Sequence, residues 1–196
     1  MKKMTFLVVV AMLCLFFKGN GQQIAVIHQA RDAYKPLKIG DKVPKLIFRN
    51  VLNTTSKELS IDKLYGKAII LDFWATWCSS CIKGFPYLEA LQEKYSKSLQ
   101  VVMVDNGERD KSEKNNIQTV FDFIAKRKAS GEQMNIPILV NETVLEELFP
   151  NYSLPHYVLI GPDGRVKAIT GFSGLTDENI KRLTSGLDLY LRVKEN

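Results

Sequence analysis

The chain has 196 residues, of which 27 are Lys or Arg and 21 are Asp or Glu, so its formal net charge is +6. With 45% hydrophobic residues, 12 Gly and 7 Pro, the composition is that of an ordinary globular protein and excludes collagen-like, low-complexity and fully disordered chains. The length suits one domain of normal size with its own core. Three cysteines are too few for a disulfide framework.

The first 21 residues have the pattern of a secretory signal peptide. Lys2 and Lys3 precede an apolar run at 5–17, and Gly19-Asn20-Gly21 follows as a small-residue cleavage site. As a helix this run rises about 20 Å, less than the roughly 30 Å of a bilayer's hydrocarbon core. An uncleaved membrane anchor is the alternative interpretation.

We therefore expect a signal peptide at 1–21, an N-terminal extension at 22–36 and a folded domain at 37–196 in the envelope of a bacterium, periplasmic or otherwise extracytoplasmic. Cleavage removes three Lys and no acid, so the net charge falls from +6 to +3. No basic cluster interleaved with aromatics follows, so nucleic acid is not an expected partner. Export leaves Cys78 and Cys81 where disulfides persist.

The first half of the folded domain predicts a strand–helix–strand unit. Residues 46–48 and 58–61 flank a polar turn and indicate a β-hairpin, and a short strand is expected at 24–27. Apolar residues are almost continuous at 67–74, as in a central strand covered on both faces. An amphipathic helix follows to about Ser96 with Pro86 inside it, then a buried strand at 100–105. The crossover between these parallel strands should be right-handed.

The second half predicts alternating helices and strands, which makes the fold class α/β. A polar stretch at 106–116 leads to a helix whose apolar positions begin at Ile117 and which ends at Gly131. The last helix starts near Thr176, and its buried face is expected to extend to Leu191. Between them we expect a strand at 136–140, a short helix at 143–149, and strands at 157–160 and 165–170 joined by a tight Gly-Pro-Asp-Gly turn.

The Cys78-Ser79-Ser80-Cys81 motif is the candidate reactive site. It stands at the start of the predicted helix, where unpaired N–H groups and the helix dipole stabilise a thiolate. Cys78 is expected to be the exposed nucleophile, and Cys81 the buried thiol that resolves a mixed disulfide.

Metal binding or a structural staple are the alternatives for this motif. A zinc site needs four ligands, but after signal cleavage only His28 and His156 accompany the two cysteines. A staple across so short a loop would restrict the unfolded chain little. Redox chemistry is therefore favoured, with no metal site.

Two neighbours of the motif fit the same chemistry. Asp72 lies within an apolar strand, where burial raises the pKa of a carboxyl group and makes it a plausible proton acceptor for Cys81. A neighbouring Lys that pairs with Asp72 is the alternative. Trp77 precedes the nucleophile and is expected to cover one side of it or, alternatively, to belong to the core.

Leu154-Pro155 comes directly before a predicted strand. A cis bond there would free the Leu154 backbone to pair with an extended substrate, although Pro at a strand start is common. His156 follows and is a candidate to lie near the sulfurs and tune the thiolate.

These residues resemble the extracytoplasmic thioredoxin-like family of TlpA/ResA type. The resemblance is carried by FWATWCSSC at 73–81, by Pro86, by LPHYVLIGPDGRV at 154–166 and by LKIGDKVPKL at 37–46. It implies a thioredoxin-like fold with a mixed sheet flanked by helices, dithiol–disulfide exchange with other proteins, no bound cofactor, and a cis Pro155 packed against the cysteines.

The chain departs from the family pattern at four places. Asp72 stands where many relatives have Asn, Gly84 where many have Glu, and His156 where Thr is common. Ser-Ser replaces the Pro-containing pairs between the cysteines. The proton-handling role of the missing Glu is one that Asp72 is expected to assume.

The leading functional hypothesis is a thiol:disulfide oxidoreductase that acts on exported thiol or disulfide proteins and draws electrons from a membrane donor. A reductase for apocytochrome c, within cytochrome c maturation, is its narrower form. A thiol peroxidase is a second hypothesis, although no Arg occurs between Arg49 and Arg109. A non-catalytic binding module with a structural disulfide is the third.

Overall fold

The computed structural model describes residues 34–56, 58–106 and 113–191. The predicted signal peptide and the predicted strand at 24–27 lie outside these residues. The chain divides into two units, 1–35 and 36–196, and all the helices and strands below belong to the second. In the described part of the chain, no helix is both long enough and apolar enough to cross a membrane.

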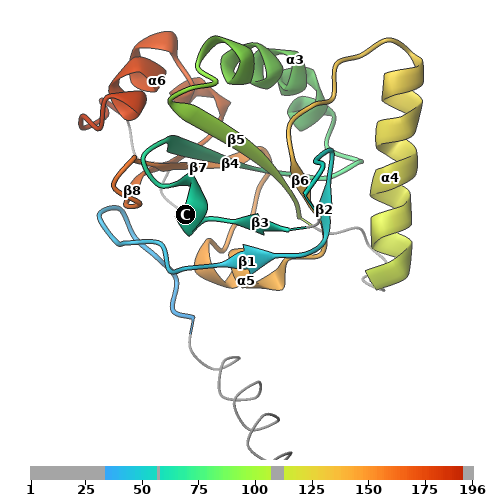
Figure 1. The fold of residues 1–196 in the computed structure, drawn as a ribbon, viewed down its shortest axis with the longest axis horizontal. Coiled ribbons are helices and arrows are strands. Elements are labelled where there is room, and N and C mark those ends of the chain that lie inside the picture. The colour runs from blue at the N-terminus through green and yellow to red at the C-terminus, as the bar shows by residue number, and fades with distance from the viewer. Residues whose placement is uncertain (1–33, 57, 107–112, 192–196) are drawn as a thin grey trace, which may run out of the picture. The chain divides into compact units, whose positions relative to one another are not determined.

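A six-stranded mixed sheet forms the centre of the second unit (Figure 1). Its order is β2-β6-β5-β4-β7-β8, with the strands at Val51–Leu52, Ile138–Leu139, Leu99–Asp105, Ala68–Trp74, His156–Ile160 and Val166–Thr170. β4 pairs in parallel with β5 and antiparallel with β7. Every residue of β4 is buried, which confirms the predicted central strand.

The predicted β-hairpin is present but differs from a simple one. β1 (Ile47–Phe48) and β3 (Leu59–Ser60) pair antiparallel. The segment between them contributes β2, which pairs with β6 at the edge of the main sheet. Because β2 is two residues long, no alternating pattern could show it in the sequence.

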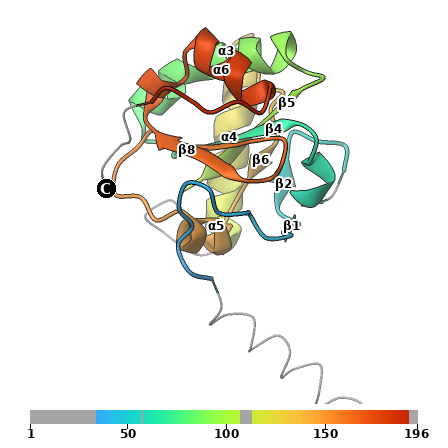
Figure 2. The ribbon, with the colours of Figure 1, turned by 90° about the vertical axis from the view of Figure 1, so that its left-hand side faces the viewer.

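Helices α3 (Ser79–Lys94), α4 (Glu113–Ala129) and α6 (Asp177–Thr184) pack on one face of the sheet. α5 (Thr143–Leu148) lies on the other face, where Phe149 at its end contacts Phe73 at 6.4 Å between ring centroids. Figures 1 and 2 show α3 and α6 above the sheet and α5 below it. Two short 3₁₀ helices are η1 (Asp62–Leu64) and η2 (Phe172–Gly174).

The turn between β7 and β8 follows from its sequence, Gly161-Pro162-Asp163-Gly164. The Gly164 amide donates to the Gly161 carbonyl at 2.9 Å, and Gly164 has a φ of 76°. A Cβ there would lie 2.8 Å from the Tyr65 ring, so glycine is required both by the backbone conformation and by the close approach of the ring. The predicted strand pair is confirmed.

Three predicted boundaries need correction. The helix expected from Ile117 begins at Glu113. The strand expected at 136–140 keeps only Ile138–Leu139, because Pro137 lacks an amide to pair with a neighbouring strand.

The last helix is shorter than the apolar pattern suggested. It ends at Thr184, and Gly186 has a φ of 72°. The amides of Gly186 and Leu187 donate back to the carbonyls of Leu183 and Arg182, which closes the helix in a Schellman motif. Leu187 and Leu191 therefore lie beyond the helix and not on its buried face.

Candidate active site

Cys78 and Cys81 are joined by a disulfide at the first turn of α3, with an S–S distance of 2.07 Å and a Cα–Cα distance of 5.4 Å. Cys78 is the N-cap residue of the helix, and its sulfur accepts a hydrogen bond from the Cys81 amide at 3.3 Å. The Ser80 hydroxyl lies 3.4 Å from the same sulfur. The Cys81 amide, in the first turn of α3, therefore donates to the sulfur that would carry the negative charge in the reduced form.

The two cysteines differ in exposure less than the sequence suggested. Cys81 is fully buried, and Cys78 is only 5% exposed. Cys78 is still the more accessible of the two, but it is not an exposed residue, because it belongs to the same apolar cluster as Trp74 and Phe85.

Trp77 and the Leu154–Pro155 bond lie on the solvent side of the site. Trp77 is 62% exposed, so it is a surface aromatic next to Cys78 and not a core residue. The Leu154–Pro155 peptide is cis, and both residues are half-buried. They line a pocket of about 470 Å³ beside the motif, together with Ser80, Lys83, Gly84, Gly171 and Phe172.

Gly84 allows Phe172 to close over the helix beside this pocket. A Cβ at position 84 would lie 3.2 Å from the Phe172 ring. Phe172 also contacts Tyr87 and Tyr157, at 5.6 and 6.3 Å between ring centroids. An aromatic side chain from η2 thus occupies the space next to Gly84 that a side chain at position 84 would enter.

Asp72 is fully buried in the middle of β4, as the sequence predicted. Its sheet partners on the two sides are Met103 of β5 and Tyr157 of β7. Desolvation raises the pKa of Asp72 to about 8, and the Tyr157 hydroxyl opposes part of that increase. Burial, and then the charge of Asp72, raises the pKa of Tyr157. The alternative of a Lys partner is not supported, since neither Asp72 oxygen has a hydrogen-bond partner among the described residues.

His156 is placed differently from the prediction. It is 1% exposed, and its ring packs edge-on against Phe73 at 5.4 Å between centroids. Since side chains alternate along a strand, His156 lies on the face opposite to Asp72 and Tyr157. It therefore does not join the cluster that contains the two cysteines.

The sequence did not single out Tyr157, Lys83 or Phe172. Tyr157 lies next to Asp72 only through the β4–β7 register, and Phe172 reaches the site only through the η2 turn. Neither relation leaves a local pattern in the sequence. Among the described residues, no three His, Cys, Asp or Glu side chains are grouped as metal ligands would be.

A disulfide at the tip of a helix, beside a cis proline and on a mixed sheet with helices on both faces, defines a thioredoxin-like thiol-disulfide oxidoreductase. The Redoxin family model matches residues 38–171, and the chain therefore belongs to the Redoxin family.

Known proteins place the chain within this class. It is 32% identical over 136 residues to the thiol-disulfide oxidoreductase ResA of Bacillus subtilis, an alignment that covers 67% of each protein. The fold is similar to the thioredoxin domain of a thiol-disulfide oxidoreductase from Bacteroides vulgatus, with a TM-score of 0.52, 21% identity and coverage of 76% of this chain and 96% of that one. StoA of Bacillus subtilis gives a TM-score of 0.50 at 24% identity, with coverage of 66% and 90%. The chain is thus a thioredoxin-like oxidoreductase of ResA type.

Proposed function

We propose that this protein exchanges disulfides with exported proteins outside the cytoplasm through Cys78 and Cys81. The observation that carries the proposal is the disulfide itself. Its Cys78 sulfur accepts a hydrogen bond from the Cys81 amide at the N-terminus of α3. A thiolate there is favoured by the helix dipole and by this hydrogen bond. The extracytoplasmic location rests on the signal-peptide pattern at 1–21.

In the proposed reaction the Cys78 thiolate attacks a substrate disulfide and forms a mixed disulfide, and the first substrate sulfur leaves. Cys81 then gives its proton to Asp72 and attacks the Cys78 sulfur. The bond between Cys78 and the substrate breaks, and the second substrate sulfur leaves with the electron pair. The substrate disulfide is reduced while the Cys78–Cys81 disulfide forms. A membrane electron donor would restore the dithiol.

The pocket beside the disulfide supports a role in substrate contact for Trp77, Leu154 and Pro155. Leu154 and Pro155 line this pocket, and we expect an extended substrate segment to pair with the Leu154 backbone. Trp77 adds an exposed apolar surface on the Cys78 side. No such role is proposed for His156, because its side chain is buried on the other face of the sheet.

A Cys81→Ser variant tests the function. With the resolving thiol removed, Cys78 should hold its substrate in a stable mixed disulfide, which is captured from an envelope fraction and identified by mass spectrometry. A matched Cys78→Ser variant should capture nothing at this position. If Cys81→Ser forms no mixed disulfide either with envelope proteins or with insulin, the proposal is wrong.

Two further assays separate the competing functions. The wild-type protein should reduce insulin in the presence of dithiothreitol, and the Cys78→Ser variant should not. Consumption of hydrogen peroxide at a comparable rate would indicate a thiol peroxidase instead. A disulfide that resists mild dithiothreitol would indicate a structural staple.

A further inference from the structure

Tyr157 lies directly across the sheet from Asp72. The antiparallel register of β4 and β7 pairs the two residues, so both side chains leave the sheet on the face that α3 covers. Both residues have no exposed surface. The Tyr157 ring belongs to the same buried cluster as Cys81 and Trp74.

Among the residues that the structure describes, the Asp72 carboxyl group and the Tyr157 hydroxyl have no hydrogen-bond partner in their surroundings other than each other. Neither oxygen of the Asp72 carboxyl group nor the Tyr157 hydroxyl has a completed hydrogen bond within the described part of the chain. Buried polar groups without a partner are costly. Three elements surround the Asp72 carboxyl group. β7 contributes the Tyr157 hydroxyl, and β5 contributes the apolar Met103. α3 contributes the two cysteines of the same buried cluster.

The same hydroxyl also approaches the wall of the pocket beside the disulfide. Its oxygen lies 3.5 Å from the position that a Cβ of Gly84 would occupy, and Gly84 lines that pocket. Residue 84 has no side chain, so no side chain at that position stands between the hydroxyl and the pocket lining. Tyr157 therefore extends from a fully buried carboxyl group towards a solvent-accessible pocket.

We propose that the Tyr157 hydroxyl positions Asp72 and passes its proton to the pocket at Gly84 during resolution by Cys81. This inference rests on the proposed function. The Cys81 S–H bond breaks and its proton moves to the Asp72 carboxylate while the Cys78–Cys81 bond forms. The carboxyl group then gives this proton to the Tyr157 oxygen, which releases its own proton to water in the pocket. Asp72 and Tyr157 thereby return to their starting states.

The hydroxyl has a second, measurable effect on the carboxyl group. The hydroxyl lowers the pKa of Asp72, and a hydrogen bond of ordinary strength that it donates once Asp72 ionises changes the ionisation equilibrium by roughly tenfold. Its removal should therefore raise the pH at which Asp72 ionises by about one unit.

The test is a Tyr157→Phe variant, which keeps the ring and removes the hydroxyl. Rapid mixing of the reduced protein with insulin resolves a second phase, in which Cys81 releases the substrate. The midpoint of its pH profile should rise by about one unit, and its rate at pH 7 should fall about tenfold. Tyr157→Met, which lacks the ring as well, should show the same shift. Infrared titration of the Asp72 carboxyl group in the oxidised protein should give the same midpoint without any turnover.

Two controls decide the result. Tyr87 also packs on Phe172, but its hydroxyl donates to the Leu175 carbonyl at 2.6 Å and not to Asp72. The pH profile of Tyr87→Phe should therefore match that of the wild type. In an Asp72→Asn background, Tyr157→Phe should have no further effect. An unchanged profile for Tyr157→Phe, or an equal loss in the Asp72→Asn background, overturns the inference. Inactivity of the wild type would instead contradict the proposed function.

Discussion

At the scale of single residues, the burial of Asp72 couples its protonation to the stability of the fold. The folded state raises its pKa to about 8, whereas an exposed Asp in an unfolded chain has a pKa of about 3.9. Between these two values the folded state binds one more proton than the unfolded state. Stability from this group is therefore greatest at low pH and falls as the pH rises towards 8.

Asp72→Asn should remove this pH dependence. For a carboxyl group that stays protonated only in the folded state, each unit of increase in pH lowers the free energy of unfolding by about 1.4 kcal/mol. The free energy of unfolding of the oxidised variant relative to the oxidised wild type should thus increase by roughly 3 kcal/mol between pH 5 and pH 7. Urea unfolding at pH 5, 6 and 7 measures it, and a difference that does not change with pH would show that Asp72 is already ionised.

The same mutation tests the predicted role of Asp72 in exchange. If Asp72 accepts the proton of Cys81, the resolving step should lose its dependence on pH between 6 and 9 in Asp72→Asn. Equal rates for variant and wild type across that range would reject the role.

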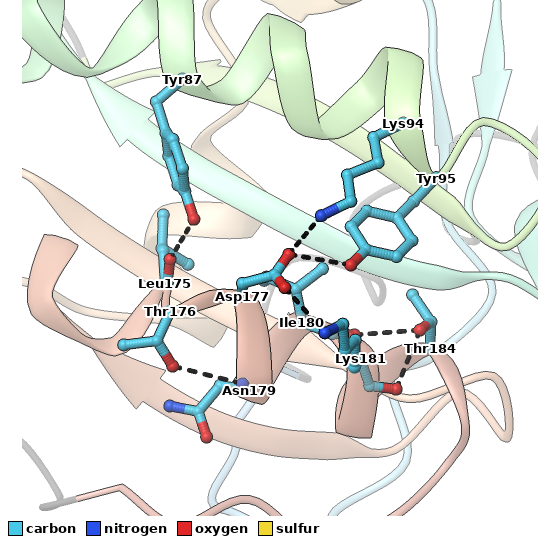
Figure 3. Close-up of polar contacts among 10 residues, drawn as sticks. All are labelled: Tyr87, Lys94, Tyr95, Leu175, Thr176, Asp177, Asn179, Ile180, Lys181 and Thr184. Carbon is cyan, nitrogen blue, oxygen red and sulfur yellow. Dashed lines mark hydrogen bonds and ion pairs between the residues drawn. The ribbon is translucent and has the colours of Figure 1, made fainter.

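At the scale of elements, α3 is held by polar contacts near its middle and at its C-terminal end. Near the middle of α3, the buried Glu89 carboxylate accepts hydrogen bonds from the amides of Asn135 and Ile136, at 2.7 and 3.1 Å. These bonds connect the helix to the segment before β6. At its end, Lys94 and Tyr95 bind Asp177 at the start of α6, at 2.5 and 3.0 Å (Figure 3). The helix that carries the cysteines is thus held against both neighbouring segments.

Glu89→Ala should destabilise the protein by about 1–3 kcal/mol, because two backbone amides lose their acceptor. Glu89→Gln keeps an amide oxygen at this position and should cost less. The exposed Glu93, one turn further along α3, provides the control, and Glu93→Ala should change stability by less than about 0.5 kcal/mol. Urea denaturation of the three variants measures the difference. Equal costs for the two Ala variants would contradict the role of Glu89.

Asp177 makes the α3–α6 contact sensitive to acid. The side chains of Lys94, Lys181 and Tyr95 lower the pKa of Asp177 below its usual value. Its contribution to stability is therefore complete above the pKa of an unfolded Asp and is lost as the pH falls through the lowered value. Asp177→Asn should reduce the urea midpoint at pH 6 but not at the acid end of the titration. Because these groups are exposed, high salt should diminish the difference.

At the scale of the whole molecule, the edges of the sheet are short or covered. β2 contributes only two residues at one edge. At the other edge, the backbone of Val166 in β8 pairs with Gly40 and Asp41, and Asp188, Leu189 and Leu191 line a pocket of about 330 Å³ beside β8. This segment is held by the bond from Arg182 to the Asp188 carbonyl at 2.7 Å and by stacking of Arg182 on Tyr190. A covered edge does not pair with other chains.

Truncation after Ser185 removes Leu189 and Leu191, which pack against the core, so it should expose apolar surface beside β8 and promote self-association. We expect light scattering and size-exclusion chromatography to show larger species than for the full chain. Truncation after Leu191 keeps the covering segment and serves as the control. A monomeric, soluble protein after truncation at Ser185 would show that β8 needs no cover.

Local pattern predicted most of this fold, and pairing between distant segments accounts for what it missed. The apolar run at 67–74, the cysteine motif and the Gly-Pro-Asp-Gly turn each contain their own signal, and the corresponding elements are confirmed. The end of α6 was misplaced because Leu187 and Leu191 continue the apolar spacing, whereas Gly186 ends the helix.

The candidate site divides in the same way. The burial of Asp72 follows from its apolar neighbours, and it was predicted. The packing of His156 against Phe73 was not predicted, since it depends on which face of β7 each residue occupies. The register between β7 and β4 determines this face, and the sequence of one strand alone does not specify that register.

Strand β7 offers two different rings in succession, the imidazole of His156 and the phenol of Tyr157, and its alignment with β4 decides which one meets the buried acid. One residue inserted between α5 and the cis bond, if absorbed as a one-step slide of β7, would exchange them. The acid would then face a base that titrates near neutrality instead of a hydroxyl. The length of that loop thus determines which side chain contacts the buried acid, and it affects the chemistry of the site as much as a side-chain substitution would.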